Sequence, residues 1–436
     1  MLTPAEQDES ISTIIEQQTL DMILDLLDLP HTFGANTFTT GATASNILGL
    51  SLAREHTISR VQARLGRPGW SVGESGFGGI EIDVFCAGAH ASVAKSASLV
   101  GIGRRNVVEV LAEDGLCAFD LVELERRLRE NVGKRGSVVV SSFGEVNTGA
   151  FTPGTKEIRE LCDRYDAWLH VDAGASFFPR CRAPELIEDR SFRSLCFPPP
   201  RLLAHLLRTR SGRQHHLGRS QMSVPLSLLL PPLTLGAGLN VPYDCGIFLS
   251  RSSPLLHSVL GPGTNAPAYL TPPTPTSSTP SIDPYRSLVS PLFLNIENSR
   301  RFRTLPVWAS LVALGKEGYR EIVSRNIEFA RKVEAWMRDG GGGGGYEVLT
   351  PLSSTDGHKT LNILLFAPAL EGPERFRGEG GAARLVAAIN GGRECYVTAT
   401  RWRGGGAIRM AVSNWGTTVG RDYEIVVRVL EEVMRG

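Results

Sequence analysis

The chain has 436 residues, of which 42% are hydrophobic and 21% are charged. This length and composition can bury a substantial core, which excludes a disordered chain, a collagen and a small disulfide scaffold. The 46 basic and 45 acidic residues leave a formal net charge of +1, so the charge gives no reason to expect a nucleic acid as a partner.

The cysteines and the apolar segments favour an intracellular protein that is not embedded in a membrane. Seven cysteines are dispersed along the chain without a CxxC pair, which is typical of reduced thiols. The first 18 residues are polar and acidic, unlike a secretory signal. Prolines and glycines interrupt the longest apolar stretch, 224–241, so no membrane span is expected. We expect a cytoplasmic location.

The first part of the chain alternates between helical and strand patterns. Apolar residues at helical spacing predict a helix over 11–29 that ends at Pro30, because proline stops a helix. A turn of small residues at 37–46 leads into a second helix. Strand patterns that alternate with helices follow at 81–88, 107–115, 135–144 and 167–175. This alternation predicts an α/β domain with a mostly parallel sheet.

Regular patterns are interrupted beyond residue 185. Residues 188–234 have no steady period and are rich in Arg, Pro, Ser and Leu. Regular structure is expected again at 239–251, and the composition of residues 267–287, rich in Pro, Ser and Thr, predicts a long mobile loop.

The C-terminal part predicts a second, smaller α+β domain. A helical pattern runs from 295 to about 338, and the glycine run 340–345 predicts a flexible connection. We expect a large domain over 1–300 and a small domain over 301–436.

Three features at the ends of these elements carry chemistry. Backbone N–H groups and hydroxyls at the helix start 40–46 predict a phosphate site, the alternative being a helix capped by a Ser or Thr side chain. His90 follows one strand and Asp172 ends another. Each alone could be an ordinary core histidine or a helix cap. Together they suit pyridoxal phosphate, because a carboxylate pairs with the protonated pyridine nitrogen and an imidazole covers the ring.

Seven segments, in order, resemble the group II pyridoxal-phosphate-dependent amino-acid decarboxylases. That family includes the aromatic-amino-acid, tyrosine, histidine and glutamate decarboxylases. The segments cover most of residues 12–185 and 239–436; they are TFTTGATASN, CAGAHASVAKSASLVGIG, SSFGEVNTGAFTP, WLHVDAGA, LNVPYDCGIFLSR, ENSRRFRTLPVWASLVALGKEGYREIV and YVTATRWRGGGAIRMAVSNW.

The resemblance implies the fold and the site. It implies the α/β fold of the PLP-dependent transferases of fold type I, a homodimer with its site at the subunit interface, and decarboxylation of an L-amino acid. Ala42 and Thr43 match the positions that hold the phosphate of the pyridoxal phosphate cofactor. His90 matches the catalytic, ring-stacking histidine, and Asp172 matches the carboxylate on the pyridine nitrogen. Thr148 lies near the position that contacts the ring face or its 3′-oxygen.

The Schiff-base lysine of the family is missing from its expected place. The family carries a D-G-H-K-x-L-N block directly before V-P-Y-D-C-G, whereas this chain has Ala237 at the lysine position. A nearly identical block, DGHKTLN, lies far downstream and contains Lys359. Because its context is that of a small-domain strand, we expect Lys359 to be a loop lysine.

This departure predicts that decarboxylation is impaired in this chain. The missing block directly follows the irregular tract 188–234, so we hypothesise that the tract is either a gene-model artefact or a lesion that inactivated the enzyme. The alternative is a catalytically dead family member that acts as a binding or regulatory subunit. An aminotransferase or aldolase of the same fold is disfavoured by the decarboxylase-like blocks at 239–246 and 297–303.

The other polar candidates remain open or are set aside. Tyr285 is a candidate catalytic-loop tyrosine by region only, and Arg409 could meet a carboxylate or form an interdomain salt bridge. No carboxylate or thiol lies at ligand spacing from His215 and His216, so no metal site is expected. The sequence does not identify which amino acid is the substrate.

Overall fold

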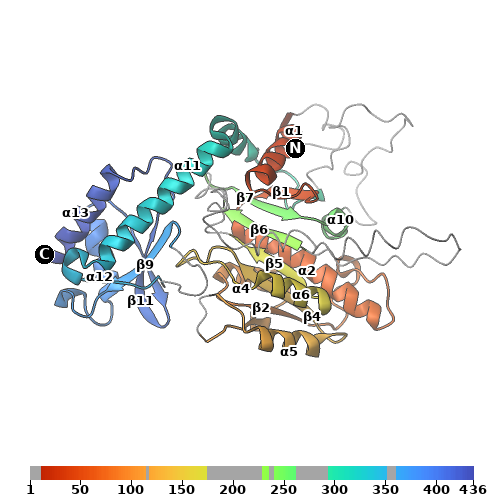
Figure 1. The fold of residues 1–436 in the computed structure, drawn as a ribbon. Coiled ribbons are helices and arrows are strands. Elements are labelled where there is room, and N and C mark those ends of the chain that lie inside the picture. The colour runs from red at the N-terminus through yellow and green to blue at the C-terminus, as the bar shows by residue number, and fades with distance from the viewer. Residues whose placement is uncertain (1–10, 114–116, 174–227, 235–239, 262–292, 351–359) are drawn as a thin grey trace, which may run out of the picture.

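The computed structural model describes residues 11–113, 117–173, 228–234, 240–261, 293–350 and 360–436. Helices surround a seven-stranded sheet, and a separate four-stranded sheet lies toward the C-terminus (Figure 1). The α/β fold class predicted from the sequence is confirmed.

The larger sheet has the strand order β1-β7-β6-β5-β4-β2-β3. Strand β7 is antiparallel to both of its neighbours, while the pairs from β6 to β3 are all parallel. Every strand except β7 therefore ends at the same edge of the sheet. The strands are β1 (Ala35–Thr39), β2 (Ile82–Cys86), β3 (Val107–Glu109), β4 (Gly136–Ser142), β5 (Trp168–Asp172), β6 (Leu228–Thr234) and β7 (Gly246–Ser250).

Side chains alternate between two cores, one on each face of this sheet. On β4, Val138 and Val140 pack with Leu48 in the core under α2, α4 and α10, whereas Val139 packs with Leu128 in the core under α1, α5 and α6. This alternation is the period of two that a strand imposes. The helices are α1 (Ile11–Leu26), α2 (Ala42–Arg64), α4 (Ala91–Leu99), α5 (Leu121–Asn131), α6 (Thr155–Arg164) and α10 (Ser253–Leu260), with the short α3 (Val72–Ser75) and η2 (Arg104–Asn106) between them.

Strand β6 lies in the tract that the sequence pattern left without regular structure. It occupies the end of that tract, residues 228–234, and pairs with β5 and β7. Its register against β7 shifts between Leu230 and Leu233. Pro231 and Pro232 lie at this shift, and proline has no N–H to donate to a ladder. Because of these two prolines, the sequence pattern did not indicate a strand here.

Helix α11 (Thr304–Arg338) joins the two sheets. In Figure 1 it runs from beside α1 to the smaller sheet. Its residues from Val307 to Ile327 pack in the core shared with α1, and those from Phe329 onward pack in the core of the smaller sheet. The helix thus contributes to cores on both sides, beginning just after the predicted domain boundary at residue 300.

The smaller sheet is entirely antiparallel, with the order β10-β11-β9-β8. Its strand β10 was not predicted, because its alternating small and charged residues resemble a loop. The elements of this part are β8 (Tyr346–Val348), β9 (Ile363–Pro368), η8 (Glu374–Phe376), α12 (Gly381–Gly391), β10 (Thr398–Trp402), β11 (Gly405–Ala411) and α13 (Arg421–Arg435).

The glycine run forms a packed turn and not the flexible connection that we predicted. Its central residues form η7 (Gly341–Gly344). A Cβ added at Gly341 would lie 2.3 Å from the Trp336 ring, and one added at Gly345 would lie 2.6 Å from the Met434 sulfur. The glycines are therefore required by close packing between α11 and α13.

The described ranges contain no helix whose length and apolar character would let it cross a membrane. In the same ranges, no group of three His, Cys, Asp or Glu side chains could hold a metal ion.

Candidate functional site

The predicted site residues gather at one edge of the larger sheet. Asp172 is the last residue of β5, and Thr148 lies in the loop that follows the neighbouring strand β4. His90 follows β2 by a short loop, and Ala42 and Thr43 begin α2 directly after β1. Because these strands all end at the same edge, the topology brings together residues from four separate segments.

The turn before α2 leaves the first N–H groups of the helix without a side-chain cap. Gly41 is the N-cap residue, so no side chain can accept from the helix start. The nearby hydroxyls bond elsewhere: Thr39 Oγ1 lies 2.6 Å from Ser45 Oγ and donates to the carbonyl of Gly41 at 3.1 Å. The alternative of a helix start capped by Ser or Thr is therefore wrong. Uncapped N–H groups at the start of a long helix favour an anion.

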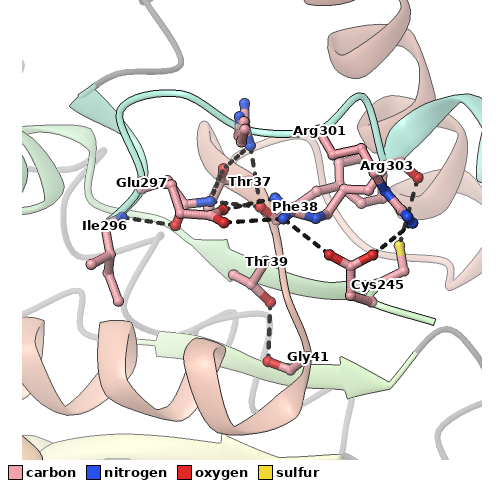
Figure 2. A network of polar contacts seen from close by, with 12 residues as sticks. Thr37, Phe38, Thr39, Gly41, Cys245, Ile296, Glu297, Arg301 and Arg303 are labelled. Carbon is pink, nitrogen blue, oxygen red and sulfur yellow. Dashed lines mark hydrogen bonds and ion pairs between the residues drawn. The ribbon is translucent and has the colours of Figure 1, made fainter.

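Hydrogen bonds from the segment 295–303 hold strand β1, which leads into this turn (Figure 2). The carbonyl of Phe38 accepts hydrogen bonds from Asn295 Nδ2 at 2.6 Å and from Arg300 Nη1 at 3.2 Å. Arg300 also pairs with Glu16 at 2.6 Å, and their side chains are only 10% and 13% exposed. Asn295 and the ENSRRFR block thus hold the strand that leads into the predicted phosphate turn.

The same segment is held to the start of β7. Arg303 pairs with Glu297 at 2.7 Å and with Asp244 at 3.3 Å, and its carbonyl accepts from Cys245 Sγ at 3.9 Å. Gly246, the residue after Cys245, lies directly against the turn before α2: a Cβ at Gly246 would lie 2.7 Å from the backbone of Gly41. Glycine at this position allows β7 to approach the predicted phosphate turn.

Asp172 is held by the amide of Asn46. The Asp172 side chain is buried, with its residue 7% exposed, and its Oδ2 accepts from Asn46 Nδ2 at 3.1 Å. The Asn46 Oδ1 atom lies 2.6 Å from Nε2 of His170, two residues before Asp172 on β5. His170 is fully buried, and burial lowers the pKa of its imidazole to about 4. The histidine is therefore neutral at physiological pH.

His90 is connected to the same amide through Ser92. Asn46 Nδ2 also donates to Ser92 Oγ at 3.0 Å, and Ser92 Oγ lies 2.7 Å from His90 Nδ1. The backbone N–H of Ser92 donates to the same ring nitrogen at 3.2 Å, so His90 is the N-cap of α4. Its imidazole is exposed. A continuous hydrogen-bond chain therefore joins His90 to Asp172.

Thr148 is buried, and its hydroxyl is already used within its own loop. Thr148 Oγ1 donates to Glu145 Oε2 at 2.9 Å, and the same carboxylate accepts from the backbone of Thr148 and Asn147. Asn147 Oδ1 accepts in turn from Thr400 Oγ1 on β10 at 2.7 Å. The structure places Thr148 at the predicted edge and links its loop to the smaller sheet.

Arg409, on β11, carries a cation toward this loop. Burial lowers the pKa of its guanidinium, and the carboxylate of Glu145 acts in the opposite direction. Its Nε atom is buried and has no hydrogen-bond partner in the described part of the chain. Within the part of the chain that the structure describes, Arg409 forms no salt bridge, and both alternatives for this residue stay predictions.

Sequence reasoning missed Asn46, Ser92, His170 and Glu145. Asn46 lies one helical turn after Ala42, in a motif that was considered for its backbone N–H groups and its hydroxyls. A polar side chain on the buried face of a helix is a usable signal, because buried polar groups need partners. Its partner Asp172 is 126 positions away, and only the fold identifies it.

Five of the six lysines lie in the described ranges, and each is exposed or engaged elsewhere. Lys316 Nζ donates to the carbonyl of Asp25 at 3.2 Å, and Lys332 lies over the Tyr423 ring at 4.5 Å. The remaining three, Lys95, Lys134 and Lys156, are exposed. Lys359 lies outside the described residues, as do Ala237, Tyr285, His215 and His216.

The chain is similar to amino-acid decarboxylases in sequence. Residues 6–203 match the model of the pyridoxal-dependent decarboxylase conserved domain. An L-2,4-diaminobutyrate decarboxylase of Acinetobacter baumannii is 34% identical over 145 residues, which are 32% of this chain and 28% of that protein. An aromatic-L-amino-acid decarboxylase of Bacillus atrophaeus is 24% identical over 77% of this chain and 57% of its own length. The matches thus span less than two thirds of these relatives.

Solved structures share the fold. The Oryza sativa TDC with PLP and tryptamine superimposes with a TM-score of 0.70 at 18% identity, covering 99% of this chain and 78% of that one. Mouse CSAD in its apo form gives 0.68 at 16% identity, covering 97% and 76%. These similarities confirm the predicted fold type I. The matched segment and the relatives show that this chain is similar to the pyridoxal-dependent decarboxylases in sequence, and the solved structures show that it shares their fold.

Proposed function

We propose that this chain binds pyridoxal 5′-phosphate at the carboxyl edge of its larger sheet, and that its ancestral reaction is the decarboxylation of an L-amino acid. The observation that carries the proposal is the hydrogen-bond chain from Asp172 through Asn46 and Ser92 to His90. It presents a buried carboxylate and an exposed imidazole together, beside an uncapped helix start.

The residues present fit the phosphate and the ring of this cofactor. The N–H groups of Ala42 and Thr43 would hold the phosphate, which the positive end of the α2 dipole also favours. Asp172 would hold the proton of the pyridine nitrogen, and His90 would cover the ring face. When bound, the cofactor supplies an electron sink for the charge that the departing carboxylate leaves on the substrate.

Each of these residues has a distinct physical task. The buried Asp172 carboxylate interacts strongly with a cationic ring nitrogen, because a charge pair is screened less in the interior than in water. His90 would shield one face of the bound ring from water. Thr148, whose hydroxyl bonds Glu145, would contribute its position in the loop rather than a free donor. Arg409 supplies a cation that suits the carboxylate of an amino-acid substrate.

We further propose that catalysis by this polypeptide is impaired. Alanine at position 237 has no side-chain amine, so it cannot form the covalent bond to the cofactor that the family lysine provides. The resemblance also supports a homodimer and a cytoplasmic location. The alternative function is that of a binding or regulatory subunit that keeps the fold without turnover.

Cofactor trapping tests the proposal. Purified protein is titrated with pyridoxal phosphate by absorbance, then reduced with borohydride, and the labelled peptide is mapped. We expect saturable, non-covalent binding that Asp172→Ala weakens at least tenfold, whereas Asp163→Ala, which removes an exposed carboxylate on α6, leaves it unchanged. Absence of binding by the wild-type protein would refute the proposal.

The reduction also decides whether the chain has a working lysine. A stable label on Lys359 would mean that the displaced block is functional, and CO₂ release from a panel of L-amino acids should then be detectable. No stable label, together with a folded dimer in sedimentation, would support the non-catalytic alternative. Sequencing the transcript through codons 188–238 separates an inactivating lesion from a gene-model artefact.

A further inference from the structure

We propose that Asn46 is a positioning residue that couples the two ring contacts of the site, orienting the carboxylate of Asp172 and, through Ser92, the imidazole of His90. The inference rests on the proposed function, since Asp172 and His90 are ring contacts only if the cofactor binds between them. The coupling itself is carried by contacts within the chain, so it can be tested without the cofactor.

The orientation of the Asn46 amide is determined by its neighbours. Its Nδ2 atom donates to Asp172 Oδ2 at 3.1 Å and to Ser92 Oγ at 3.0 Å, while its Oδ1 faces His170 Nε2 at 2.6 Å. An ionised carboxylate only accepts hydrogen bonds. The flipped amide would set its oxygen against that carboxylate, so the observed orientation is the one that the site can hold.

His170 reinforces the same orientation from the other side. Its Nδ1 is buried and has no hydrogen-bond partner among the described residues, so a proton on that nitrogen would find no acceptor there. The single ring proton therefore lies on Nε2 and is donated to Asn46 Oδ1. Every polar group of the Asn46 side chain is used, and all of its partners lie in the buried interior between α2, α4 and β5.

The donor-to-acceptor order of the hydrogen bonds continues from Asn46 through Ser92 to His90. Ser92 Oγ accepts from Asn46, so the Ser92 hydroxyl proton is available to His90 Nδ1 at 2.7 Å. The Ser92 backbone N–H donates to the same nitrogen at 3.2 Å. The lone pair of Nδ1 is thereby engaged, so the ring proton of the neutral imidazole lies on Nε2.

Chemical modification of the cofactor-free protein tests the coupling. Diethyl pyrocarbonate attacks the unprotonated ring nitrogen, which in His90 is the engaged Nδ1. We expect Ser92→Ala to accelerate modification of His90 at least threefold, measured by peptide mapping relative to His31 in the same molecule. The matched control is Ser96→Ala, which removes another buried serine hydroxyl from α4 that bonds the carbonyl of Thr43.

The corresponding test of Asn46 uses a buried amide on the same helix as its control. Asn46→Ala should also accelerate modification of His90, because the Ser92 hydroxyl loses the donor that directs it. Gln62→Ala removes an amide that bonds Gly78 outside this chain and should leave the rate within twofold of the wild type. Equal rates at His90 in Asn46→Ala, Ser92→Ala and the wild-type protein would overturn the coupling.

A comparison of two ligands tests the orientation of Asp172. Pyridoxal phosphate is compared with its analogue in which carbon replaces the ring nitrogen. Asn46→Ala should weaken binding of pyridoxal phosphate about tenfold and that of the analogue less than twofold, because only the former has a nitrogen for Asp172. Equal weakening of both ligands would indicate a merely structural residue and would refute the proposal.

The two experiments distinguish this proposal from the proposed function. If the wild-type protein binds neither ligand, the proposed function fails, and the ring contacts fail with it. The modification rates would still decide whether Asn46 and Ser92 control the reactivity of His90. If binding is normal and neither variant changes His90 or the ligand preference, the proposed function stands and the positioning role of Asn46 is wrong.

Discussion

Gly49 on α2 lies directly against His170 on β5: a Cβ added to the glycine would lie 2.4 Å from Cε1 and 2.7 Å from Nδ1 of the imidazole. The contact lies one helical turn from Asn46, which bonds the other nitrogen of the same ring. A missing side chain on the helix and a buried ring on the sheet therefore set the distance between α2 and β5. That distance in turn places Asn46 at Asp172.

We predict that Gly49→Ala destabilises the protein by about 2 kcal/mol, because the added methyl group must displace a buried ring. The measurement is the free energy of unfolding in urea. Gly391→Ala is the control, since a Cβ in this last turn of α12 would meet no atom within 4 Å. It should be neutral or slightly stabilising. Equal stability of Gly49→Ala and the wild type would show that the helix can move away without cost.

One fully buried and one half-buried histidine predict a loss of stability in mild acid. Burial lowers the pKa of His170 and of His56 to about 4, while the unfolded chain titrates near 6.5. Between these values the unfolded state binds more protons, so the free energy of unfolding falls as the pH is lowered from about 6.5 to 4. Each histidine contributes a slope of about 1.4 kcal/mol per pH unit.

The variant His56→Phe removes the contribution of one histidine to the pH dependence of the free energy of unfolding. His56 packs against the Trp168 ring at 5.3 Å and takes no part in the site. In this variant the slope below pH 6.5 should decrease by about 1.4 kcal/mol per pH unit, while the slope above pH 7 stays that of the wild type. An unchanged slope in acid would mean that His56 is protonated in the folded protein. Urea unfolding at a series of pH values provides the measurement.

We predict that the Arg300–Glu16 ion pair is worth more than the exposed pairs. Arg300→Met would leave the buried Glu16 without its cation and free the Phe38 carbonyl from one donor, costing about 3 kcal/mol. The control Arg428→Met breaks an exposed pair with Glu394 and should cost about 0.5 kcal/mol. Chemical denaturation compares the two. A cost below 1 kcal/mol for Arg300→Met would mean that β1 is held mainly by Asn295.

We predict that Arg409→Met weakens binding of a carboxylate ligand and does not destabilise the fold. The guanidinium is half-buried and its Nε has no partner, so replacing it with an apolar side chain removes a desolvation cost. Calorimetric titration with L-amino acids should show an affinity about tenfold lower. The control Arg401→Met, at an exposed position on β10, should leave the affinity unchanged. Equal affinity of Arg409→Met and the wild type would favour a purely structural role.

The sequence predicted the alternating elements of the larger sheet because their apolar periods are long and regular. It did not predict β1, whose residues Ala35–Thr39 are mostly small and polar yet all buried. A strand of this kind is identified only by its partner β7 and by the bonds to Asn295 and Arg300. The prediction of a flexible connection at the glycine run was wrong for a different reason. Its composition suggests flexibility, but composition does not show that aromatic rings pack against these glycines.

The candidate site shows the same limit. His90 and Asp172 were predicted because each follows a strand, and parallel strands end at a common edge. The amide between them was not predicted, because its partners lie on two other elements, up to 126 positions away in the sequence. Long-range hydrogen bonds of this kind leave no periodic signal in the sequence, and only the packing of α2 against β5 shows them.

Helix α11 makes the stability of the two sheets a shared property. It contributes Val307, Leu311 and Tyr319 to one core and Phe329, Val333 and Met337 to the other. Unfolding of either core would expose the apolar side chains of one half of α11 and would weaken the packing of the other half. A partly folded chain with one intact sheet is therefore expected to have little stability of its own. The protein should therefore melt in a single transition despite its two sheets, and a destabilising substitution in either core should lower the melting temperature of the whole.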